Sequence, residues 1–359
     1  MAIAPTAQST SQRDLGDVGL SPLWSGLARL GGALPSPLPT APETENAAAQ
    51  TTDADAISLP AARLAVAQPV RPASLRYPAQ GPRFDVSVAP GGYAWWYIDA
   101  TSDDGAHGLT IIAFIGSVFS PYYKASGRQC PENFCALNVS LNGPRGGAWA
   151  MTERSAAGLA RDANTLIIGP SALHWDGDCL TIDINEVSAP LPYPVRGQVR
   201  VYPAHIGATG FHLDPAGRHR WHPIAPRARV EVAMAAPGIS WSGGGYFDSN
   251  FGEESLEDGF VDWHWSRAHL ARDVAVLYEG TRRSGQPFEL ALRMDAAGNW
   301  EDVVPPPALP LARSAWGISR VTRADAGARP HVTRTWIDAP FYARSALDTT
   351  LFGERVGAV

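Results

Sequence analysis

Residues that could carry acid–base or metal chemistry are concentrated between His212 and His269. Four of the twelve tryptophans fall in this window. Because exposing so much aromatic area is costly, we expect these rings to line a core or a pocket. The residues of interest are His212, His219, Trp221, His222, Trp241, Tyr246, Asp248, Glu253, Glu254, Glu257, Asp258, Asp262, Trp263, His264 and Trp265.

The histidines of this window have three interpretations. His212, His219 and His222 could ligate a metal ion, but strands and loops give them no fixed ligand geometry and no thiolate lies nearby. We therefore expect no metal site. The histidines could instead be ordinary hydrogen-bonded residues, or His219 could orient a nearby carboxylate.

Tyr246 and Asp248 are two residues apart, so a strand would direct both to the same face and Phe247 to the other. Each candidate also has a plain structural interpretation. Trp221 and Tyr246 could be core aromatics, and Asp248 could be a turn residue before Ser249. The acidic run from Glu253 to Asp262 is expected to form a solvated rim.

Several functional classes are disfavoured by the composition. The chain lacks a GxxxxGK[ST] phosphate loop, a GxGxxG turn, a GxSxG elbow and an HExxH helix, and the run Gly243-Gly244-Gly245 indicates a close backbone approach or a bulge. A net charge of -6 argues against nucleic acid as a partner. Three cysteines, an odd number, suit a reducing compartment better than a disulfide framework.

The elements that position these residues are predicted to be antiparallel strands, so the fold class is all-β. Short alternating runs recur from Phe84 onward, bounded by Gly, Pro, Asn and Asp, and no segment shows a sustained helical apolar stripe. Two hairpins are expected. One joins Val274–Tyr278 to Phe288–Met294, and the other joins Trp316–Ile318 to Val332–Trp336. The remaining runs are Phe84-Val86-Val88, Leu180-Ile182-Ile184, Val199-Val201 and Val230-Val232-Met234.

The chain of 359 residues has room for two β-domains behind a tail. Residues 1–80 are rich in Ala and Pro and are predicted to be a flexible tail. Prolines and basic residues interrupt the strand pattern between Ile206 and Pro226. We therefore place domains at 81–215 and 216–350.

Four strings of the sequence carry a specific resemblance. They are GGYAWWYIDATSDDGAHGLTIIAFIGSVFSPYY from Gly91, PENFCALNV from Pro131, WAMTER from Trp149 and YFDSNFGEESLEDGFVDWHWSR from Tyr246. In this order they resemble the carotenoid 1,2-hydratase family, also called hydroxyneurosporene synthase, with similarity from about Phe84 to Leu347. The resemblance implies a pair of lipocalin-like β-barrels and a cofactor-independent hydro-lyase that adds water to the terminal C=C of acyclic carotenoids.

The resemblance also implies a catalytic set. His219 and Trp221, and Tyr246 and Asp248, match the family's His-x-Trp and Tyr-x-Asp motifs. Hydration of an unactivated alkene begins with protonation by a strong, correctly aimed acid, for which Asp248 is the candidate. The rings of Trp221 and Tyr246 would stabilise the carbocation, and His219 would hold the water or bond Asp248.

Three further tryptophans are predicted to bind the substrate, namely Trp241, Trp263 and Trp265. Alternative functions remain open at this point. The chain could be a non-catalytic carotenoid carrier or a lipocalin-like pericyclase, neither of which needs a buried acid. Glycoside hydrolysis by carboxylates of the acidic run is disfavoured because a polar groove is missing from the pattern.

The expected partners are an acyclic carotenoid, water and a membrane surface. The sequence shows no signal peptide and no apolar run of spanning length, so we expect a cytoplasmic protein bound peripherally to the inner or intracytoplasmic membrane. The contact is expected from Phe119-Ser120-Pro121-Tyr122-Tyr123 or from the N-terminal tail.

Overall fold

The computed structural model describes residues 68–340 and 342–359, and the predicted all-β class is confirmed. Helical structure in this part of the chain is limited to four short segments. These are α2 (Pro121–Ala125), η1 (Pro131–Asn133), η2 (Ala156–Gly158) and α3 (Leu256–Gly259). The absence of a long apolar stripe of helical period explains why no longer helix forms in these residues.

The largest sheet in the described residues has 13 strands. Its order is β5-β4-β3-β2-β13-β12-β10-β9-β8-β7-β6, with β1 and β11 attached beside β12. Its strands are β1 (Ala73–Arg76), β2 (Tyr93–Ser102), β3 (Gly108–Ile115), β4 (Cys135–Gly143), β5 (Gly146–Arg154), β6 (Leu159–Arg161), β7 (Thr165–Ile168), β8 (Ser171–Trp175), β9 (Leu180–Val187), β10 (Pro194–Pro203), β11 (Thr209–His212), β12 (His219–Ala236) and β13 (Ile239–Gly252).

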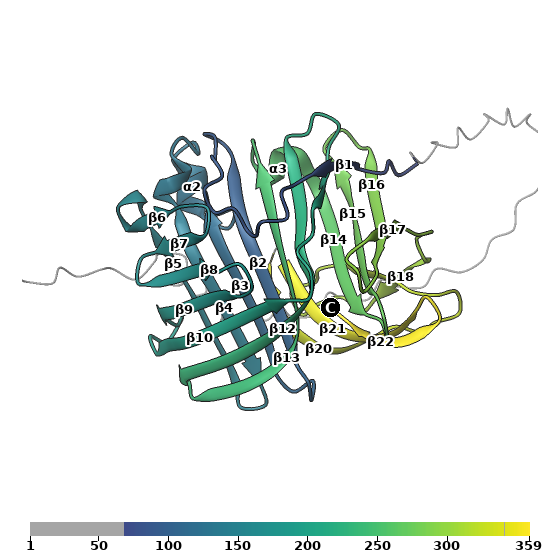
Figure 1. The fold of residues 1–359 in the computed structure, drawn as a ribbon. Helices are drawn as coiled ribbons and strands as arrows, with labels where there is room; N and C mark the ends of the chain where they lie inside the picture. Colours follow the sequence, from purple (N-terminus) through teal and green to yellow (C-terminus); the bar gives the residue numbers. More distant parts are fainter. Residues whose placement is uncertain (1–67, 341) are drawn as a thin grey trace, which may run out of the picture. The chain divides into compact units, whose positions relative to one another are not determined.

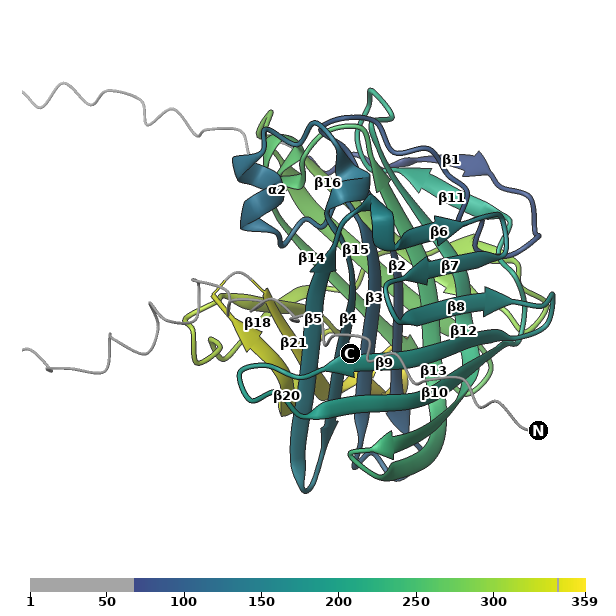
Figure 2. The same cartoon turned by 90° about the vertical axis from the view of Figure 1, so that its left-hand side faces the viewer.

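This first sheet curls around its own core. Figure 2 shows β6 to β10 crossing the direction of β2 to β5, although all belong to one sheet. The concave face gathers side chains from nearly every strand, among them Trp96, Ile111, Leu137, Ile182 and Val230. The result is a nearly closed barrel whose interior is filled by side chains.

A second sheet of seven strands follows in the described chain, in the order β17-β16-β15-β14-β22-β21-β20, and two further strands form a ribbon (Figure 1). The seven are β14 (Phe260–His269), β15 (Val274–Arg282), β16 (Pro287–Met294), β17 (Trp300–Asp302), β20 (His331–Ala339), β21 (Tyr342–Leu351) and β22 (Glu354–Ala358). The ribbon pairs β18 (Ala308–Leu311) with β19 (Arg320–Arg323).

The outer face of the first sheet is apolar where the second sheet covers it. Tyr97 and Phe114 from the first sheet pack in one buried cluster with Val276 and Leu290 from the second. Because both faces of β2, β3 and β13 are covered, their burial is almost continuous rather than alternating. This aromatic layer between the sheets, called the intersheet cluster below, holds the candidate site.

The expected hairpin around Gly285 is confirmed, since β15 pairs with β16 from Val274↔Met294 to Thr281↔Pro287. The second expected hairpin is wrong. Trp316 and Ile318 lie outside any strand, β19 pairs with β18, and β20 pairs with β21. Local alternation identified one of the two predicted strands, Val332–Trp336 within β20, but not its partner.

The alternating run from Phe84 to Val88 is also not a strand. Phe84 is fully buried and packs edge-on against Trp96 at 5.0 Å between ring centroids. The apolar residues that predicted a strand here belong to a loop that packs against the core.

The proline-rich interval around residue 223 does not end the first sheet. β12 runs through it with register shifts at Ala225, where prolines lack the N–H that a ladder needs. The sheets change between Gly252 and Phe260 instead, and a domain boundary at 215/216 stays a prediction. The close approach expected of Gly243 is confirmed, because a Cβ there would collide with Thr101 on β2.

The predicted flexible tail falls mostly outside the described residues. Its last part, from residue 68, is placed in the structure: β1 pairs with β11, and Tyr77 stacks on His222 with centroids 4.1 Å apart.

Two neighbouring residues of β7 test the packing of the first core. Ile168 is 1% exposed and Ile167 is 38% exposed. Ile168→Ala is expected to lower the free energy of unfolding by about 2–5 kcal/mol because it leaves a cavity, and Ile167→Ala by about 0.5 kcal/mol or less. Denaturant titrations of both variants measure this, and equal losses would contradict the inward orientation of Ile168.

Candidate active site

Asp248 lies on β13 and points into the intersheet cluster, where its side chain is held by two hydrogen bonds. Trp221 Nε1 and the Tyr246 hydroxyl both donate to Oδ2, each at 2.8 Å. The other oxygen, Oδ1, is buried and has no hydrogen-bond partner within the described residues. Because Oδ2 already accepts two hydrogens, a proton carried by this carboxyl group resides on Oδ1.

The strands fix this arrangement. Trp221 on β12 is opposite Asn250 on β13, and Tyr246 precedes Asp248 by two residues on the same face. Phe247 points the other way, into the first core. The three predicted residues Trp221, Tyr246 and Asp248 are thus brought together, and all are buried.

Burial raises the pKa of Asp248 to about 7, and the hydrogen bonds from Trp221 and Tyr246 oppose that rise. The nearby anion Asp99 raises the pKa further. Burial also raises the pKa of the Tyr246 phenol well above its usual value, so this hydroxyl keeps its proton and acts as a donor. Asp248 is therefore an acid that is about half protonated at neutral pH.

Aromatic rings enclose the acid. Trp265 approaches Tyr246 with centroids 4.8 Å apart, and Tyr97 lies 5.7 Å from Trp265. Tyr278 meets Trp221 edge-on at 5.3 Å. These rings have electron-rich faces, and such an environment is able to stabilise a cation.

His219 is buried on the same strand as Trp221 but belongs to a different hydrogen-bond network. Its Nδ1 lies 3.0 Å from the Tyr93 hydroxyl and its Nε2 lies 3.2 Å from Glu254 Oε1. A Cβ at Gly259 would collide with its ring. Burial lowers the pKa of His219, although Glu254 opposes this.

The expectation that His219 bonds Asp248 is therefore not met, because both ring nitrogens face other groups. Its catalytic role stays a prediction. In the structure Tyr93 and Glu254 hold the orientation of the His219 ring. The neighbouring acidic residues form rim ion pairs, such as Glu253 with Arg220 at 3.0 Å and Glu257 with Lys124 at 2.9 Å.

The three tryptophans predicted to bind substrate lie in different places. Trp265 is part of the intersheet cluster. Trp263 is 37% exposed near the start of β14. Trp241 packs against the first core and stacks with His107 at 6.1 Å, away from the cluster around Asp248. Only Trp265 contacts the rings around the acid.

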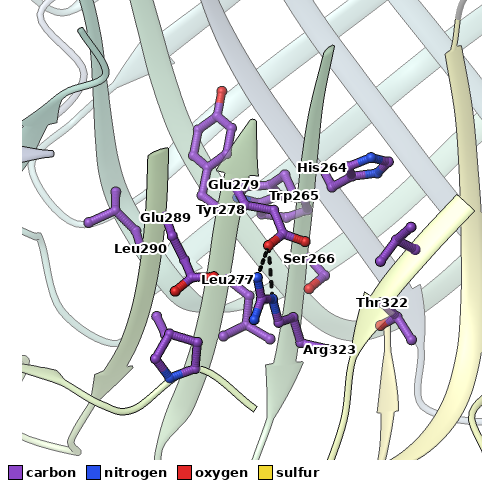
Figure 3. A pocket seen from close by; sticks show the side chains of 13 residues that line it. His264, Trp265, Ser266, Leu277, Tyr278, Glu279, Glu289, Leu290, Thr322 and Arg323 are labelled. Carbon is purple, nitrogen blue, oxygen red and sulfur yellow. Dashed lines mark hydrogen bonds and ion pairs between the residues drawn. The ribbon is translucent and has the colours of Figure 1, made fainter. Parts of the chain in front are cut away.

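A pocket opens beside β14 to β16, where Trp265 and Tyr278 form part of the wall (Figure 3). Arg323 reaches across the pocket and forms ion pairs with Glu279 and Glu289, so the charged groups of the pocket neutralise one another. No group of three or more potential metal ligands occurs among the residues that the structure describes.

Sequence reasoning missed a second buried polar group beside the acid. Asp99 on β2 is fully buried and pairs with Arg267 on β14 and Arg344 on β21. Burial raises the pKa of Asp99, but the two guanidinium groups outweigh burial and hold it below its usual value. The available signal was a carboxylate within the otherwise apolar run of β2.

Comparison with known proteins agrees with the sequence resemblance. The family model described as "Carotenoid hydratase CrtC" matches residues 111–359. An acyclic carotenoid 1,2-hydratase of Thiocapsa roseopersicina is 53% identical over 286 residues, covering 79% of this chain and 71% of that protein. The enzyme of the same name from Rubrivivax gelatinosus is 46% identical, covering 77% of this chain and 70% of that protein.

Among solved structures, a putative AttH from Nitrosomonas europaea is similar in fold. The TM-score is 0.52 at 15% sequence identity, and the match covers 81% of this chain and 98% of that one. At this identity the likeness concerns the fold alone.

The buried acid makes stability depend on pH in a defined direction. Between about pH 4 and 7 the folded protein keeps a proton on Asp248 that the unfolded chain releases, so this group lowers the free energy of unfolding as pH rises. Asp248→Asn mimics the protonated form. We expect its stability relative to the parent to rise by a few kcal/mol over this range.

Denaturant titrations of both proteins at several pH values measure the difference. Parallel pH profiles for parent and variant would contradict a raised pKa for Asp248. Asp262→Asn, at an exposed position of β14, serves as the control and should leave the profile of the parent unchanged.

Proposed function

This chain belongs to the carotenoid hydratase CrtC family, and from that membership we propose that it adds water across the terminal C1=C2 bond of acyclic carotenoids such as neurosporene and lycopene. The observation that carries the proposal is the carboxyl group of Asp248. Two donors hydrogen-bond to one of its oxygens. The other oxygen is buried between aromatic rings and has no hydrogen-bond partner in the part of the chain that the structure describes.

In the first step Asp248 Oδ1 transfers its proton to C2, and the π electrons form the new C–H bond. The positive charge develops at C1, which carries two methyl groups and is the better-stabilised position. An ordinary aspartate with a pKa near 3.9 is protonated about once in a thousand at pH 7, a penalty of about 4 kcal/mol. A pKa of about 7 removes most of that penalty.

In the second step the lone pair of a water molecule attacks C1, and the oxonium proton passes to the Asp248 carboxylate. The product is a tertiary alcohol and the acid is restored, so the cycle needs no cofactor. Trp221 and Tyr246 serve both steps. Their hydrogen bonds stabilise the carboxylate once it has lost its proton, and their rings face the developing cation.

The neighbouring groups limit side reactions. Burial raises the pKa of the Tyr246 and Tyr278 phenols, so neither is an anionic nucleophile that could capture the cation. The aromatic walls also exclude bulk water, which leaves the number of water molecules near C1 under the control of the protein.

We also propose that the protein takes its substrate from a membrane surface on the cytoplasmic side. Among the residues that the structure describes, no helix is long and apolar enough to cross a membrane. Within the expected contact motif Tyr123 is buried and Tyr122 is 46% exposed. The helix α2, which carries Tyr122, is joined to α3 by the ion pair between Lys124 and Glu257. Val261 and Trp263 follow α3 as exposed apolar residues.

The acid assignment predicts a steep loss on substitution. Asp248→Asn should lower the rate of lycopene hydration by about 10²–10⁴-fold, because it removes the proton donor while keeping the shape. The rate of the parent should fall as pH rises above about 7, where Asp248 is deprotonated. The purified protein is incubated with lycopene in liposomes, and the gain of one water by the carotenoid is measured by chromatography and mass spectrometry.

Asp183→Asn is the matched control, since it removes an exposed carboxyl of β9, a strand that carries neither the acid nor the proposed membrane contact, and it should hydrate at the parental rate. Hydration by Asp248→Asn at the parental rate would remove Asp248 as the acid. Binding of the polyene without hydration by the parent would favour the carrier interpretation.

The membrane proposal is tested by co-sedimentation with liposomes. Trp263→Ser should lower the bound fraction severalfold, because an exposed indole near α3 contributes strongly to interfacial binding. Trp316→Ser is the matched control, as Trp316 is 53% exposed but lies in the segment between β18 and β19. Equal effects of the two substitutions would refute a contact at this position.

A further inference from the structure

A second polar group lies beside the acid on the same face of the first sheet. In the pairing of β13 with β2, Asp248 is opposite Tyr97, and Tyr246 is opposite Asp99. Directly opposed residues of an antiparallel pair point to the same face. Asp99 therefore lies two residue positions along the strands from the level of Asp248, on the same face, and Arg267 and Arg344 reach it there from the second sheet.

The two arginines are bound very differently. Arg267 donates to Asp99 Oδ1 from Nε at 2.7 Å and also from Nη2. The Tyr97 hydroxyl donates to Asp99 Oδ2 at 3.0 Å. Arg344 is left with an ion pair to Oδ2 at 3.3 Å from Nη2 and with the Tyr97 hydroxyl beside it. Within the described structure none of its three nitrogens makes a hydrogen bond of good geometry.

This excess of donors needs an explanation. The side chain of Arg344 is 3% exposed, and a guanidinium group carries five N–H donors. Burial lowers the pKa of Arg344, but Tyr97 and Asp99 outweigh burial, so the group stays a cation. Leaving such donors unpaired costs free energy, which indicates that they serve an oxygen acceptor during function.

The reaction supplies one further acceptor, the oxygen of the attacking water. His219 was expected to hold it, but both ring nitrogens of His219 face Tyr93 and Glu254. Resting on the proposed hydration, we propose that Arg344 binds this water and so decides whether the carbocation is hydrated or returns its proton. Arg344 donates to one lone pair of the oxygen. The second lone pair attacks C1, and the released proton goes to the Asp248 carboxylate.

Charge supports the placement. Asp99 neutralises one arginine, and the carboxylate formed when Asp248 gives up its proton balances the other. The second cation therefore opposes the carbocation less than its bare charge would. The polar group facing Arg344 from its own strand is Tyr342, two residues earlier on the same face, whose pKa burial raises.

Loss of the water-binding group has a distinctive consequence. Asp248 still protonates C2, but an uncaptured cation loses a proton from C2 or from a methyl group on C1 to the Asp248 carboxylate. The net result is exchange of hydrogen with solvent, or a shifted double bond, without a gain of water. A purely structural role for Arg344 predicts that protonation and hydration fall together.

The test follows both processes in D₂O with lycopene in liposomes. Mass spectrometry measures the initial rates of water gain and of deuterium entry into unhydrated carotenoid. For Arg344→Met we expect the ratio of exchange to hydration to rise at least about tenfold over the parent, as removal of a donor to a reacting oxygen costs at least that much. Arg344→Lys, which keeps the charge and some donors, should give an intermediate ratio.

Arg267→Met is the matched control, because it removes a cation from the same carboxylate but one already committed to Asp99. Its rates of hydration and exchange should fall together, leaving the ratio unchanged. An unchanged ratio in both Arg344 variants overturns the water-binding role. A parent protein that neither hydrates nor exchanges overturns the proposed function itself.

Discussion

A carboxyl group buried among aromatic rings is stable here because two donors hold one of its oxygens. Trp221 and Tyr246 both donate to Asp248 Oδ2, which leaves Oδ1 as the position of the proton. This requirement fixes the pairing of β12 with β13, since a shift of one residue would turn Asp248 into the opposite core. The buried carboxyl group must also be shielded from solvent, and Trp265 and Tyr278 of the second sheet shield it.

The first sheet consequently serves two cores at once. Phe247 packs inside its curled face, while Tyr246 and Asp248 on either side of it face the intersheet cluster. Two of the three consecutive glycines of β13 allow the strand to lie close to its neighbours, because a Cβ at Gly243 would collide with the backbone of β2 and one at Gly245 with Val230. The candidate site thus lies on the outer face of the curled sheet, at its junction with the second sheet.

The local pattern of apolar residues predicted much of the fold and of the candidate site. The remaining features depend on which strands pair with one another. The two-residue spacing of Tyr246 and Asp248 was enough to place them on one face, and the hairpin around Gly285 followed from a short turn between alternating runs. The partner of Asp99 could not be predicted, because Arg267 is 168 positions away and meets it only after both sheets have formed. The ribbon β18–β19 and the true partner of β20 were missed for a different reason. Both pairings join neighbouring segments, and short apolar alternation does not tell which neighbouring segment a strand pairs with.

The electrostatics of the site balance two opposing needs. A buried acid is protonated at neutral pH but is a weak donor, whereas hydrogen bonds to its carboxylate make it a stronger donor but leave it protonated less often. The single anion Asp99 raises the pKa of Asp248, while its two arginines make the surroundings of that anion cationic overall. Because Arg267 donates to Oδ1 of Asp99 and Tyr97 donates to Oδ2, the N–H donors of Arg344 are left for an oxygen that reaches the intersheet cluster. Buried ion pairs of this kind often stabilise a fold less than apolar contacts of the same volume would, so their presence between the sheets fits the proposed role of these charges in hydration.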